Sequence, residues 1–151
     1  MFDMRYLLAS CLSLMLICCA PYKNFAGFRV LNEEEHALWI MTVDCFVGSG
    51  IMPYDRLVYQ EPVIQFVPEV DHPKCPRNRD GCALSDGRIY IHNGYEQYPE
   101  IARLTTLLIH EYKHWILFQA GIVGSRNIDH KSLWWDKDSP CPDNLHLTAR
   151  G

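Results

Sequence analysis

The stretch LLIHEYKHWILF, residues 107–118, sets a polar centre in an apolar frame. Its flanks are leucine, isoleucine and aromatic residues, which are typical of a helix buried in a protein core. Its middle nevertheless holds His110, Glu111, Lys113 and His114. Charged side chains are seldom buried unless they are paired or hold a ligand. We therefore expect a central helix that presents both histidines to one cleft, with Lys113 pointing to water.

His110, Glu111 and His114 fit the pattern H-E-x-x-H. Residues four apart lie on one face of an α-helix, so two imidazoles one turn apart can bind the same Zn²⁺ ion. Glu111 lies beside the first ligand, where its carboxylate can act on a water molecule without being a ligand itself. The alternative is a structural pair of histidines. The motif lies inside a long apolar helix that follows a strand. This context favours a site for one zinc ion over a structural pair of histidines.

A catalytic zinc site needs a third protein ligand. In metzincins a glycine and a histidine follow three and six residues after the second histidine, but Leu117 and Ala120 occupy those places here, which excludes that class. We expect His130 to be the third ligand, because the chain after Gly121 is long enough to return along the helix. Asp129 is the alternative, either as the ligand or as a partner that orients a metal-bound imidazole.

The pattern around this helix predicts a few further elements. Residues 32–48 predict a helix that begins with a capping box of Asn32 and Glu35. Residues 63–67 and 88–92 predict two strands, the first between prolines and the second between glycines. The long helix is expected over residues 99–120, and a short helix at the HKSLWW stretch. These elements indicate an α+β fold with a short antiparallel or mixed sheet packed on the metal-binding helix.

Length and charge restrict the domain number and the partners. The chain has 151 residues, which suits one domain with its own core, over residues 20–151. Its formal net charge is −4, so a broad basic surface is not expected. Because nucleic-acid binding depends on such a surface, we expect no nucleic-acid partner.

The N-terminus predicts an export signal over residues 1–19. One arginine precedes an uncharged apolar run that is too short to span a bilayer comfortably. A lipoprotein signal would place a lipid on Cys19 and attach the protein to a membrane, although Cys18 stands where a small residue is usual. A cleaved signal, a short anchor and a buried helix are the alternatives. We expect a bacterial envelope protein, lipidated or periplasmic, or a secreted one.

The cysteines agree with export. Four cysteines follow residue 20, and an even number in an exported chain indicates disulfides. Cys75 and Cys82 bracket the turn-rich octapeptide CPRNRDGC and are expected to pair. That leaves Cys45 with Cys141, which would stabilise the domain by joining its first helix to the C-terminal tail. The alternative is a cysteine zinc site, but this part of the chain has no C-x-x-C pair.

Residues 87–135 resemble the active-site segment of SprT-like minimal zincin metallopeptidases. The resemblance rests on HEYKH, on the spacing from His114 to His130, and on the HKSLWW stretch that follows. It implies a small zincin-like domain in which His110, His114 and His130 are the zinc ligands and Glu111 is the base. Leu133 or Trp134 would match a trailing core position. Lys131 departs from the family, which has a small residue there.

The resemblance also implies a mechanism and a substrate. Glu111 would take a proton from the attacking water and pass it to the leaving amine of a protein or peptide substrate. In zincins a strand before the metal helix pairs with extended substrate, so Arg88, Tyr90 and His92 are the candidate substrate-binding residues. An oxyanion donor is also needed. The candidates for it are Tyr90, Tyr95 and His146.

Two other functions fit the same sequence. The first is a module that keeps zinc only for stability, against which Glu111 argues because a structural site needs no carboxylate at that position. The second is an envelope lipoprotein that binds a partner and contains the H-E-x-x-H pattern by accident. Metal content separates these functions from a peptidase.

Overall fold

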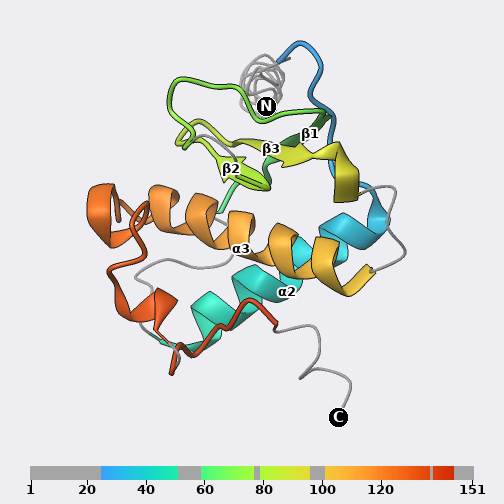
Figure 1. Ribbon diagram of the computed structural model, residues 1–151. Coiled ribbons are helices and arrows are strands. Elements are labelled where there is room, and N and C mark those ends of the chain that lie inside the picture. Colours follow the sequence, from blue (N-terminus) through green and yellow to red (C-terminus); the bar gives the residue numbers. More distant parts are fainter. Residues whose placement is uncertain (1–24, 51–58, 77–78, 96–100, 137, 145–151) are drawn as a thin grey trace, which may run out of the picture.

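The computed structural model describes residues 25–50, 59–76, 79–95, 101–136 and 138–144. The predicted signal at residues 1–19 and the candidate His146 lie outside these ranges. Figure 1 shows a small sheet on one side of two helices, with α3 (Ile101–Gln119) running between the sheet and α2 (Glu33–Gly48). The α+β class expected from the sequence is confirmed.

The sheet has three strands: β1 (Val63–Val67), β2 (Gly81–Ala83) and β3 (Arg88–His92). Their order is β1-β3-β2, with β1 parallel and β2 antiparallel to β3, so the sheet is mixed. The strands β1 and β3 have the bounds that their sequence predicts. The strand β2 was not predicted, because the stretch between the two predicted strands is rich in Pro, Gly and Asp, which is typical of a loop.

β2 is a strand because of its partner. Its sequence, Gly-Cys-Ala, has no preference for the extended conformation. Cys82 nevertheless lies opposite Tyr90 on β3, and the N–H of Leu84 donates to the carbonyl of Arg88 at 2.8 Å. Tertiary pairing therefore overrides a weak local preference.

α2 begins as predicted. The side chain of Asn32 accepts from the N–H of Glu35 at 2.9 Å, and the carboxylate of Glu35 accepts from the N–H of Asn32 at 2.8 Å. Arg29 also donates to both oxygens of Glu35, at 2.7 and 2.8 Å, which ties the preceding segment to the helix. Within the described ranges, no helix is both long and apolar enough to cross a membrane.

The two faces of the sheet have different surroundings. The inner face carries Ile64, Ile89 and Ile91, which are fully buried in one core with both helices. The outer face carries Tyr90, which packs on a second, smaller cluster. The members of that cluster are Val70, Cys82 and Leu84.

Both predicted disulfides are present. Cys45–Cys141 joins α2 to the C-terminal segment across 96 residues. Cys75–Cys82 closes the loop that leads into β2. The first bond connects distant parts of the chain, and the second is local.

Candidate metal centre

Three histidines meet at the surface of α3. His110 and His114 lie one helical turn apart, and His130 comes from the loop after the short 3-10 helix η3 (Gly124–Arg126). One ring nitrogen from each can be chosen so that all three lie within 4.8 Å of one another, a spacing that could hold a metal ion. The alternative ligand, Asp129, is exposed and is not a member of this group among the described residues.

The burial of α3 explains why its histidines are held firmly. Leu108, Ile109, Tyr112 and Ile116 are buried in the core around the helix axis. Burial, with the neighbouring His110 adding to it, lowers the pKa of His114 to about 3. A neutral imidazole is the form that binds metal, so this environment suits a ligand.

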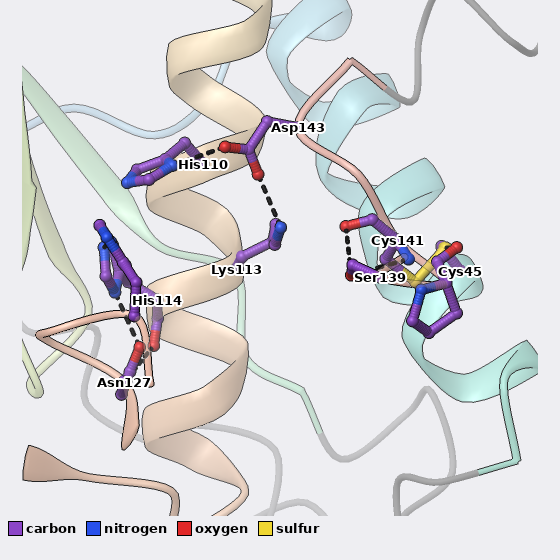
Figure 2. Close-up of polar contacts among 10 residues, drawn as sticks. Cys45, His110, Lys113, His114, Asn127, Ser139, Cys141 and Asp143 are labelled. Carbon is purple, nitrogen blue, oxygen red and sulfur yellow. Dashed lines mark hydrogen bonds and ion pairs between the residues drawn. A yellow bond between two sulfur atoms is a disulfide. The ribbon is translucent and has the colours of Figure 1, made fainter. Parts of the chain in front are cut away.

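The outer nitrogen of each helical histidine has its own partner. The Nδ1 atom of His110 is 2.7 Å from Oδ2 of Asp143, and the Nδ1 atom of His114 is 2.7 Å from Oδ1 of Asn127 (Figure 2). Asn127 also donates to the carbonyl of His114 at 3.0 Å. These contacts leave Nε2 of each ring for a metal, and Nε2 of His114 lies 3.1 Å from Nε2 of His130.

Lys113 does not point to water. Only 2% of it is exposed, and its Nζ lies 2.6 Å from Oδ1 of Asp143 and 4.5 Å from the ring centre of Trp135. Burial raises the pKa of Asp143, but the hydrogen bonds from His110 and Lys113 outweigh it and lower that pKa to about 2. The expectation of a solvated lysine is therefore wrong, because an ion pair compensates its burial.

Trp135 forms a wall against all three histidines. It lies in the 3-10 helix η4 (Leu133–Trp135), and its ring centre is 4.8, 4.5 and 4.3 Å from those of His110, His114 and His130. The neighbouring Trp134 instead stacks on Phe46 in the core, with 4.4 Å between the ring centres. The two neighbouring tryptophans therefore have different surroundings, Trp134 in the core and Trp135 at the histidines.

Glu111 is buried beside the histidines, with 3% exposed. Its Oε2 atom has no hydrogen-bond partner among the described residues, whereas the N–H of Ala83 donates to the carboxylate. Burial raises the pKa of Glu111 to about 7, although the charge of His110 opposes this. A Cβ atom at Gly81 would lie 2.7 Å from Oε1, so only glycine fits against this carboxylate without a shift.

A cleft of about 870 Å³ opens over these groups. Its walls are α3, β2 and the loop closed by Cys75–Cys82, and its floor includes the three histidines and Glu111. The donor set is three imidazoles with one unpartnered carboxylate oxygen nearby. Nitrogen donors of this kind fit Zn²⁺ and other first-row transition metals.

The predicted substrate-binding strand lies elsewhere. β3 is the central strand and pairs on both sides, so the expectation that it pairs with substrate as an edge is wrong. Arg88 donates to Asp86 and lies over the ring of Phe25. The ring centres of Tyr90 and Phe28 are 5.0 Å apart. These two side chains and His92 do not line the cleft; the edge strand beside α3 is β2.

The oxyanion donors expected from the sequence fare differently. Tyr90 belongs to the outer face and does not line the cleft. Tyr95 is the last residue of the 3-10 helix η2 (Asn93–Tyr95), and its side chain and His146 lie outside what the structure describes.

Sequence reasoning missed the two partners of the helical histidines. Asn127 lies 13 residues after His114, and Asp143 lies 33 residues after His110, in a polar C-terminal stretch with two prolines that predicts neither a helix nor a strand. One signal for Asp143 was present. A bond between Cys45 and Cys141 brings the tail to α2, and α2 packs on α3.

We also compared the chain with known proteins. No protein-family model, no curated protein and no solved structure matches it.

Proposed function

We propose that this chain is a zinc-dependent peptidase. The observation that carries the proposal is Oε2 of Glu111, a buried carboxylate oxygen without a partner in the described structure, beside three clustered histidines. A buried polar atom without a partner is costly, so its retention favours a role toward a ligand. A water molecule bound at Oε2 would satisfy it.

The number of ligands favours catalysis over a purely structural role. Structural zinc sites are closed by four protein ligands, whereas catalytic sites use three and keep one position open. The described residues offer three histidines, and these open into the cleft. This arrangement supports a peptidase over the zinc-stabilised module that fits the same sequence.

The chain's own residues would act as follows. A bound zinc ion would supply a Lewis acid that polarises a carbonyl and acidifies water. Glu111 accepts a proton from the attacking water at Oε2 and passes it to the leaving amine. Asp143 and Asn127 hold the two helical imidazoles in orientation through Nδ1. β2 is the edge strand that lines the cleft, and an extended peptide would lie along it.

Export and kinship belong to the same proposal. We place the protein in a bacterial envelope or outside the cell. Residues 1–19 carry its export signal, which would end at Cys18 if Cys19 takes the lipid. Two disulfides agree with an oxidising compartment. We relate the metal helix and its return loop to the SprT-like zincins, without their DNA partner, because the chain is acidic.

The test is metal analysis coupled to a peptide-library cleavage assay. We expect near-stoichiometric zinc and cleavage that a chelator abolishes. Glu111→Gln should keep zinc and lose about 10²–10⁴-fold in kcat/KM, the usual contribution of a general base. Glu34→Gln, on the exposed first turn of α2, is the matched control and should behave as wild type. Hydrolysis that survives in Glu111→Gln would refute the mechanism.

The third ligand has its own test. His130→Ala should weaken zinc binding by about 10²–10³-fold, since roughly 10–16 kcal/mol of binding at four-ligand structural zinc sites corresponds to about 2.5–4 kcal/mol per ligand. Asp129→Ala is the control next to it and should bind zinc normally. The opposite result would make Asp129 the ligand.

A further inference from the structure

The C-terminal segment, residues 138–144, links α2 to the metal helix. Cys141 is fully buried and bonded to Cys45 on α2. Two residues later, Asp143 contacts α3 through both carboxylate oxygens, at 2.7 Å from His110 and 2.6 Å from Lys113 (Figure 2). A covalent bond and an ion pair are therefore separated by a single residue, Pro142, whose ring restricts the backbone between them.

Few hydrogen bonds connect this segment to the rest of the described structure. Its remaining hydrogen bonds within the described structure are local or lie at the disulfide itself: Ser139 donates to Asp136 at 2.9 Å and exchanges bonds with Cys141 at 3.2 and 3.3 Å. Without the disulfide, the last residue held firmly before Asp143 would be Trp135, and the ion pair would have to hold the carboxylate against the greater entropy of the chain between them. The disulfide is thus the covalent restraint closest to the carboxylate.

The two helical histidines depend on different parts of the chain. Asn127 orients His114 from the loop directly after α3, and it also bonds to the backbone of that helix. Asp143 orients His110 from the C-terminal segment, which a disulfide bonds to α2. A carboxylate on Nδ1 fixes the tautomer and the ring orientation of a metal ligand and raises its basicity.

We propose that Asp143 is a positioning residue of the metal centre, and that the centre reaches its full metal affinity only after the Cys45–Cys141 disulfide has formed. Bond formation removes two protons and two electrons from the two thiols. An external disulfide accepts them and becomes two thiols. Oxidation of Cys45 and Cys141 would then complete a metal site whose ligands all lie outside the C-terminal segment.

This inference rests on the proposed metal site but not on peptide hydrolysis. Its readout is metal affinity, so a protein that binds zinc and cleaves nothing would refute the peptidase and leave this inference standing.

The experiment measures the Kd for Zn²⁺ by competition with a chromogenic chelator. Asp143→Ala should weaken binding about 10–100-fold, as the loss of such partners does elsewhere. The double variant Cys45→Ser with Cys141→Ser should lose a similar factor. Serine is used because free thiols would themselves bind zinc. Adding Asp143→Ala to the double variant should cause little further loss, because both changes remove the same contact.

Two controls separate positioning from general damage. Cys75→Ser with Cys82→Ser removes the other disulfide, which holds no histidine partner, and should leave zinc affinity nearly unchanged. Asp143→Asn keeps an oxygen acceptor for His110 and should recover part of the affinity lost in Asp143→Ala. The visible spectrum of bound Co²⁺ should change in Asp143→Ala, since it reports ligand geometry.

Each outcome decides the proposal. Wild-type affinity in Asp143→Ala would overturn the positioning role, and an equal loss in both disulfide variants would reduce the effect to instability. If the Cys45/Cys141 variant does not fold, two glycines inserted between Pro142 and Asp143 keep the bond but free the carboxylate. That insertion should weaken zinc binding, and unchanged affinity would overturn the coupling.

Discussion

The two faces of the sheet show how a polar pattern can mislead. The inner face consists of buried isoleucines and ends, at the edge strand β2, against Glu111. The outer face carries the polar side chains Arg88, Tyr90 and His92, which were the candidate substrate-binding residues. Residues 25–28 and the Cys75–Cys82 loop pack against this face. Alternation in a strand predicts that its two faces differ. It does not predict which face is turned to the metal helix.

The strongest test of this difference is Gly81→Ala at the inner edge. The new methyl group would lie 2.7 Å from Oε1 of Glu111 and displace the proposed base. We expect kcat/KM to fall by about 10²–10⁴-fold, as for loss of the base itself, with zinc affinity retained. Gly48→Ala is the control, because nothing lies within 4 Å of its added Cβ. Normal turnover in Gly81→Ala would show that the carboxylate has room to move.

Stability should distinguish the two faces next. Ile91→Ala on the inner face removes a fully buried side chain and should lower the free energy of unfolding by about 2–5 kcal/mol. His92→Ala, its neighbour on the outer face, should change that free energy by less than about 1 kcal/mol. Urea unfolding in the presence of a chelator measures both without a contribution from metal. Equal losses would mean that the outer face is also part of the core.

The smallest expected effect lies at Asp86, on the turn before β3. Partial burial raises the pKa of Asp86, but the hydrogen bonds and charge of Arg88 outweigh it, so the net pKa is lowered from 3.8. The pair therefore stabilises the fold above the unfolded pKa, and this contribution disappears as the pH falls through the lower folded value. We expect Asp86→Asn to cost less than about 1 kcal/mol at pH 7, because the pair is solvent-accessible.

Unfolding of the wild type and of Asp86→Asn at pH 7 and in stronger acid measures this difference. It should shrink as the pH falls. A difference that grows in acid would contradict the sign.

The fold could be predicted where the signal is local. The strands β1 and β3 and both helices follow from periodicity and caps within their own residues. β2 could not be predicted, because three residues without strand preference become a strand only when β3 lies beside them. Pairing of this kind is a property of the whole fold.

The site divides in the same way. His110, Glu111 and His114 are contiguous on one helix, and His130 follows at a distance that loop length can judge. The contact of Asp143 with His110 could not be predicted from local sequence, because it depends on where the folded C-terminal segment lies. Lys113 was expected to be solvated because no partner for its charge lies nearby in the sequence. Its ion-pair partner, Asp143, lies 30 residues away. Local sequence therefore identified the candidate metal-binding histidines but not the groups that orient and compensate them.

The Cys45–Cys141 bond also makes most of the domain a covalent ring. Every described strand, α3 and His130 lie between these two residues. A single backbone cut at any point within that ring leaves two pieces that cannot diffuse apart until the disulfide is reduced. A nicked molecule would therefore keep its histidines together and run as one species on a non-reducing gel, which gives this chain tolerance to proteolysis.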